Sequence, residues 1–129
     1  GHGADALSSD TVAGALSVSR HWLHERVRFS ARGALRLIHA YGDSMEPTMR
    51  DSDILLVDTG QRDPGVIDGV YVLRADGRLY IKRVRKRYNS NELEVSSDNP
   101  TVKTVDVLDG SHALDVIGRV VWVWNGVRL

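Results

Sequence analysis

The octapeptide YGDSMEPT, residues 41–48, decides how this sequence is interpreted. A glycine before Ser44 and a proline after it predict a tight turn at the end of a strand. Such a turn presents the Ser44 hydroxyl and leaves the backbone N–H groups of Asp43 and Ser44 free to form an oxyanion hole. Because serine is a poor nucleophile at neutral pH, it needs a base beside it. The octapeptide therefore predicts a nucleophile whose base must come from elsewhere in the chain.

A lysine is the remaining candidate for that base, since no histidine has the companions of a Ser-His-Asp arrangement. Lys82 lies in the apolar segment LYIKRV, residues 79–84, on the same face as Tyr80 and Val84 because side chains alternate along a strand. We therefore expect Lys82 to point inward, where burial disfavours the charged form of a lysine side chain. Ser44 and Lys82 are the predicted nucleophile and general base. The only other lysines are Lys86 and Lys103.

Short apolar segments separated by turn residues predict a mostly β fold with antiparallel strands. An Asp-Gly pair at 76–77 indicates a hairpin, and Gly118 is expected at a bulge. One short helix is expected at 20–27, with Trp22, Leu23 and Val27 on one face. The expected strands cover residues 34–41, 53–58, 69–74, 79–87, 92–96, 104–108 and 114–124.

The composition excludes several classes of function. The 129 residues fit one domain, and 17 basic residues balance 17 acidic ones. A domain that holds DNA by itself usually carries a basic excess, so we do not expect this one to bind nucleic acid alone. There is no cysteine, and the histidines lack metal-ligand spacing, so neither a metal nor a cofactor is expected. No apolar run reaches the roughly 18 residues of a membrane span, and no signal peptide is visible, so we expect a cytoplasmic protein without a membrane partner.

The first residues read differently from the rest of the chain. Gly1-His2-Gly3 is typical of an expression scar, and the small polar residues after it have little to bury. We predict a tag scar and linker at residues 1–12 and the folded domain at residues 13–129.

Several motifs, in order, resemble the LexA-like Ser/Lys serine peptidases, and in particular the C-terminal domains of lambda-like, phage-type transcriptional repressors. Residues 41–58 resemble the nucleophile box of that family, and residues 79–84 resemble its general-base strand. SSDNP at 96–100 and VIGRV at 116–120 resemble the turn and the closing strand that follow. The resemblance covers about residues 34–124. One departure is Ser52, where the family usually has glycine, and where a positive φ would be strained.

The resemblance implies a LexA/signal-peptidase-like antiparallel β fold with a short N-terminal helix and a Ser44–Lys82 dyad. It also implies self-association into a homodimer or higher oligomer, and operator DNA binding through a helix-turn-helix domain before residue 1. Many members cut themselves at an Ala-Gly bond when RecA filaments stimulate them. Ala13-Gly14 is the one such pair in this chain, although any linker can contain one. Residues 19–27 resemble repressors that have no evident cleavage site, so whether the chain is an active enzyme stays open.

Two other functions share the same motifs. Bacterial signal peptidases have a similar serine box and lysine strand, but they need a membrane anchor. A polymerase accessory protein like UmuD would have only a short arm before the domain. Two further features are ambiguous. The basic residues at 83–87 indicate either a solvated strand end or a minor nucleic-acid contact. Trp122 and Trp124 are expected on one face of the last strand, with Val121 and Val123 on the other, where one face packs in the core and the other could form a dimer contact.

Overall fold

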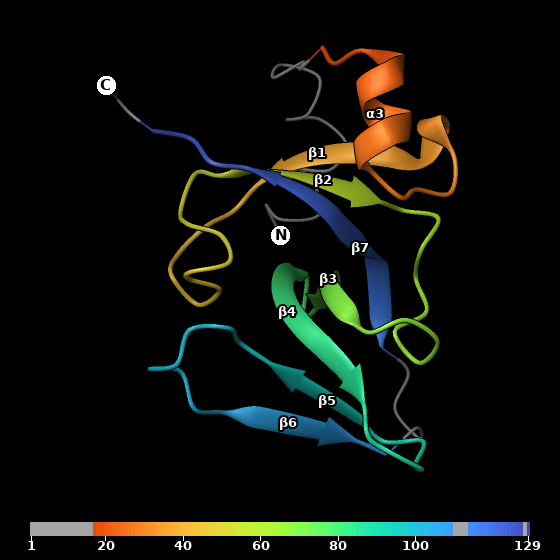
Figure 1. The fold of residues 1–129 in the computed structure, drawn as a ribbon. Helices are drawn as coiled ribbons and strands as arrows, with labels where there is room; N and C mark the ends of the chain where they lie inside the picture. The colour runs from red at the N-terminus through yellow and green to blue at the C-terminus, as the bar shows by residue number, and fades with distance from the viewer. Residues whose placement is uncertain (1–16, 110–113, 128) are drawn as a thin grey trace.

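The structure is a computed structural model that describes residues 17–109, 114–127 and 129. These parts of the chain form a helix, a 3-10 turn and one antiparallel sheet in the order β1-β2-β7-β3-β4-β5-β6, as Figure 1 shows. The expected mostly β fold with a short helix before it is confirmed. The elements are α3 (Arg20–Arg26), η2 (Arg32–Ala34), β1 (Leu35–His39), β2 (Ile54–Asp58), β3 (Gly69–Ala75), β4 (Arg78–Lys86), β5 (Leu93–Ser96), β6 (Val105–Leu108) and β7 (Asp115–Trp124).

The β3–β4 hairpin forms where the Asp-Gly pair predicted it. Ala75 pairs with Arg78, and the two turn residues Asp76 and Gly77 have φ angles of 53° and 74°. A two-residue turn with positive φ at both positions matches the right-handed twist of the flanking strands. This hairpin places Lys82 on β4 opposite Tyr71 of β3.

Strand β2 is buried on both faces and divides two hydrophobic clusters. Leu55 and Val57 pack with Ile38 and Val72 on one side, whereas Leu56 packs under α3 on the other. The alternation follows from the two-residue period of a strand. The cluster around Leu55 also contains Met45 and Met49, so it forms the floor under the serine turn.

The tryptophans of β7 pack against α3. Trp22 makes an edge contact with Trp122 at 5.0 Å between ring centroids, and it stacks on Trp124 at 5.8 Å. The helix is held in place by Ser19, whose hydroxyl accepts a hydrogen bond from the Trp22 backbone N–H at 3.0 Å. Core packing therefore accounts for the tryptophan face, which the sequence left open between core and dimer contact.

Strand β7 has two irregularities that strict alternation does not foresee. Val57 pairs with Val120 and Leu56 with Trp122, so Val121 is an extra residue in the ladder. A bulge reverses the alternation locally, and Val121 packs in the tryptophan cluster. The expectation that Val121 and Val123 share a face was therefore wrong. The second irregularity lies between Val116 and Gly118, next to the glycine expected at a bulge.

Gly118 lets β7 approach β2 closely. A Cβ atom on residue 118 would lie 2.6 Å from the backbone oxygen of Asp58, a contact that side chains do not make. Asp58 itself is fully buried and ties the segment before η2 to β2, because its carboxylate accepts hydrogen bonds from the N–H and hydroxyl of Ser30, from Gly60 and from Gln61. Burial alone would raise the pKa of Asp58, but these hydrogen bonds outweigh burial and hold the pKa below its usual range.

Ser52 stands where the family usually has glycine, and it adopts the left-handed conformation with a φ of 74°. The conformation costs an L-residue about 1–2 kcal/mol, whereas glycine adopts it freely. Ser52→Gly should therefore raise the free energy of unfolding by about 0.5–1 kcal/mol, after allowing for the greater entropy of glycine in the unfolded chain. Urea denaturation measures this change.

Asp76→Gly is the matched control, because Asp76 also has a positive φ but aspartate tolerates the left-handed region better than serine does. The increase in the free energy of unfolding should be smaller for Asp76→Gly than for Ser52→Gly. A Ser52→Gly variant that is no more stable than the parent would show that the turn carries no strain.

Candidate active site

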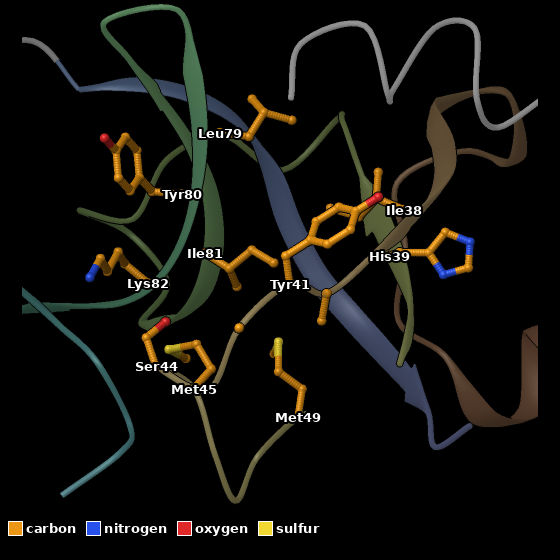
Figure 2. A pocket seen from close by; sticks show the side chains of 12 residues that line it. Ile38, His39, Tyr41, Ser44, Met45, Met49, Leu79, Tyr80, Ile81 and Lys82 are labelled. Carbon is orange, nitrogen blue, oxygen red and sulfur yellow. The ribbon is translucent and has the colours of Figure 1, made fainter. Parts of the chain in front are cut away.

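A pocket opens between the end of β1 and the beginning of β4, two strands that are not neighbours in the sheet. Residues 38–42 form one wall and residues 79–82 the other, with Met45 and Met49 below. Figure 2 shows Ser44 and Lys82 close to one another at one end of this pocket. The structure therefore brings the predicted nucleophile and base to one pocket from separate elements.

The turn that carries Ser44 is built by two aspartates that follow it. Asp51 accepts a hydrogen bond from the Gly42 N–H at 2.7 Å, and Gly42 has a φ of 78°. Asp53 is buried and accepts hydrogen bonds from the N–H groups of Arg50 and Gly126 at 2.9 and 3.0 Å. These contacts fix both ends of the turn, and Ser44 lies half-buried between them.

Lys82 is half-buried on β4, and its Nζ donates a hydrogen bond to the hydroxyl of Ser97 at 2.8 Å. Among the described residues, no hydrogen bond joins Lys82 to Ser44. Ser97 directly follows β5, whose last residue, Ser96, pairs with Arg83 next to Lys82. No sequence motif predicts Ser97 as a site residue, because its contact with Lys82 depends on the pairing of β4 with β5.

The loop after β5 also fastens the lysine strand to the serine turn through Asp98. The Asp98 carboxylate accepts two hydrogen bonds from the Arg83 guanidinium, at 2.7 and 2.8 Å, and a third from the hydroxyl of Thr48. The Asp98 N–H points at the sulfur of Met45 at 3.4 Å. The hydrogen bonds from Arg83, helped by Thr48, hold the pKa of Asp98 below its usual range in spite of partial burial.

Acidic residues balance part of the basic cluster at 83–87, as expected for a solvated strand end. Arg83 pairs with Asp98, and Arg87 pairs with Glu92 and Glu94 at 3.5 and 3.0 Å. These pairs neutralise two of the four basic side chains, and Arg85, Lys86 and Arg87 are all exposed.

The backbone groups predicted to form the oxyanion hole lie in the serine turn. The carbonyl oxygen of Asp43 accepts hydrogen bonds from Glu46 N–H at 3.1 Å and from the Asn99 side chain at 2.9 Å. In the described part of the chain, the N–H groups of Asp43 and Ser44 have no acceptor. The proposed cleavage site, Ala13-Gly14, lies outside the described residues. No cluster of three or more potential metal ligands occurs in residues 17–109 and 114–127.

The fold and this pocket define the class of the protein: an antiparallel β domain in which a turn serine and a strand lysine share one pocket. The profile of the Peptidase S24-like family matches residues 1–121, and the chain belongs to that family. The resemblance of the sequence motifs to the LexA-like Ser/Lys peptidases is therefore confirmed at the level of this family. Among curated proteins, none matches the chain significantly. No helix in the described residues is long and apolar enough to cross a membrane.

Because the pKa of Asp98 is lowered in the folded state, we predict that the free energy of unfolding depends on pH in the acidic range. A carboxylate whose pKa is lower in the folded than in the unfolded state stabilises the fold above its unfolded pKa, near 3.9, and this contribution is lost as the pH falls through the folded pKa. The parent should therefore lose stability steeply below about pH 4. Asp98→Asn should lower stability at pH 7 by about 1–3 kcal/mol and weaken this pH dependence.

Asp115→Asn is the control, because Asp115 also pairs with an arginine, Arg74, but on the exposed surface. An exposed pair is worth at most about 1 kcal/mol, so this variant should remain close to the parent. Chemical denaturation from pH 3 to pH 7 tests both variants. If both variants lost the same free energy of unfolding, the Asp98–Arg83 pair would contribute no more to stability than an exposed ion pair.

Proposed function

We propose that this S24-like domain is the C-terminal dimerisation and self-cleavage domain of a phage-type transcriptional repressor, with Ser44 as nucleophile and Lys82 as general base. The observation that carries the proposal is that both residues line one largely apolar pocket between the end of β1 and the beginning of β4. The repressor role is supported by the motifs at 41–58, 79–84 and 96–100, which resemble those of the C-terminal domains of phage-type repressors.

The proposed reaction is hydrolysis of the Ala13-Gly14 peptide bond. Neutral Lys82 takes the proton of the Ser44 hydroxyl as Ser44 Oγ attacks the carbonyl carbon of Ala13. Backbone N–H groups of the serine turn stabilise the negative oxygen of the tetrahedral intermediate. The carbon–nitrogen bond then breaks, and Lys82 passes its proton to the amine of Gly14. Water hydrolyses the resulting ester and frees Ser44.

The hydrogen bond between Lys82 and Ser97 suits this reaction. It holds the lysine side chain at the end of the pocket where Ser44 lies. For proton transfer, the amine of Lys82 must also come within hydrogen-bond distance of Ser44. Catalytic hydrogen bonds of this kind often form only when substrate is bound.

Cleavage would switch the repressor off by lowering its avidity for DNA. A helix-turn-helix domain before residue 1 would read one operator half-site, and this domain would pair two such chains in the cytoplasm. Cutting at Ala13-Gly14 separates the DNA-binding domain from the dimerisation domain. A DNA-binding domain that holds one half-site alone binds more weakly than a linked pair. A RecA filament is the proposed partner that stimulates the cut.

Self-cleavage is tested by intact mass after incubation at mildly alkaline pH, which favours the neutral amine of a lysine. The parent should lose its first thirteen residues, whereas Ser44→Ala and Lys82→Ala should keep their full mass. Lys86→Ala and Ser90→Ala are matched controls, because both lie outside the pocket, and they should be cut like the parent. An uncut parent, with and without RecA filaments, would rule out self-cleavage.

Self-association is tested separately with the Ser44→Ala variant, which stays uncut. Sedimentation equilibrium at micromolar to hundred-micromolar concentration should give the mass of a dimer or a larger oligomer. A monomer over this whole range would contradict the dimerisation role, whatever the outcome of the cleavage assay.

A further inference from the structure

We propose that Asn99 is a positioning residue that aims the N–H groups of Ser44 and Met45 at the oxyanion, and so completes the oxyanion hole from 56 residues away. This inference rests on the proposed function of Ser44. The sequence motifs named only the N–H groups of Asp43 and Ser44 for this role. The structure adds the residue that orients two of the peptide groups in the turn.

Asn99 holds two consecutive peptide groups of the serine turn. Its side-chain Nδ2 donates to the carbonyl oxygen of Asp43 at 2.9 Å, and its backbone N–H donates to the carbonyl oxygen of Ser44 at 3.0 Å. Both carbonyl oxygens therefore face the loop after β5. A carbonyl and the N–H of the same trans peptide point in opposite directions, because the peptide unit is planar.

The N–H groups of Ser44 and Met45 consequently point together, away from Asn99. In the described part of the chain, neither N–H has an acceptor. Two successive N–H groups on one side of the backbone form a concave site that favours a negatively charged oxygen. Since Ser44 and Met45 both line the pocket, a negative oxygen formed on a carbon bonded to Ser44 Oγ would lie close to this pair.

The orientation of the Asn99 side chain is fixed by its other contacts. Its Oδ1 accepts hydrogen bonds from the N–H of Thr101 at 3.0 Å and from the Thr101 hydroxyl at 2.8 Å. These two donors define which end of the amide is the oxygen, so Nδ2 must face Asp43. Asn99 is only 9% exposed, and its own carbonyl accepts from Val102. The amide is therefore held in place before any substrate binds.

Asn99→Asp is the decisive variant. It keeps the oxygen that Thr101 binds and the backbone N–H that binds Ser44, but it replaces the donor to Asp43 by an oxygen that repels that carbonyl. The Asp43–Ser44 peptide group should rotate, so that the Ser44 N–H no longer points towards the site of the oxyanion. Asn99→Ala is the second variant, since it removes the donor without introducing repulsion.

The readout is the rate at which a fluorophosphonate labels Ser44. In this reaction Ser44 Oγ bonds to phosphorus, fluoride leaves, Lys82 takes the hydroxyl proton, and the phosphoryl oxygen needs the same N–H donors. Loss of an oxyanion donor typically lowers such rates by about 100-fold to 1,000-fold. We expect a fall of about that size in Asn99→Asp and a smaller one in Asn99→Ala.

The pH dependence separates positioning from a general loss of structure. If Asn99 acts on the N–H groups alone, the pH midpoint of labelling stays at the parent's value, because Lys82 and Ser97 are untouched. The control Asn91→Ala, an exposed asparagine outside this loop, should label like the parent. A labelling rate that falls only in proportion to the folded fraction, measured by thermal unfolding, would overturn the positioning role.

Failure of the proposed function would look different. In that case the parent would label no faster than Ser44→Ala. The orienting role is then read from the amide ¹H and ¹⁵N resonances of Ser44 and Met45, which do not depend on catalysis. Asn99→Asp should shift both resonances well beyond those of Asn91→Ala, and unchanged resonances would overturn the inference.

Discussion

The pocket depends on the contact between the loop after β5 and the turn after β1. The two segments are about fifty residues apart in the chain and come from opposite halves of the sheet order. Asp98 and Asn99 join them through hydrogen bonds to Thr48 and to the carbonyl oxygens of Asp43 and Ser44. Asp98 is half-buried and Asn99 is buried, so a lost partner would leave a costly unpaired polar group on either residue. The contact therefore stabilises the fold and fixes the position of Ser44 together.

The shape of the sheet makes that contact possible. β1 and β4 are separated by three strands, yet a single pocket has walls from both. β7 lies between them and carries two register shifts, and bulges of this kind increase the local twist of a strand. Gly118 allows β7 to pass close to β2 at the same place. The irregular strand in the middle of the sheet thus helps to bring its distant parts to one site.

The site combines a fixed serine turn with a lysine held by a second hydroxyl. Ser44 is fixed through its backbone, by Asp51 and Asp53 within the turn and by Asn99 from outside. Lys82 is held through its side chain, by Ser97. In the proposed reaction the lysine side chain must move towards Ser44, whereas the backbone donors are already held by the turn.

Local patterns in the sequence were enough to predict the strands, the hairpin at Asp76-Gly77 and the residues Ser44 and Lys82 that the structure places in one pocket. They were enough because the two-residue period, turn chemistry and the serine box act within a few neighbouring residues. Local patterns did not predict the roles of Ser97, Asp98 and Asn99, because each residue binds a partner 15 to 56 residues away in the chain. Local patterns also did not predict the face on which Val121 lies, because the bulge at this residue interrupts the two-residue alternation of β7. Only the tertiary structure decides such features, since strand register and long-range hydrogen bonds are set when distant segments pack together.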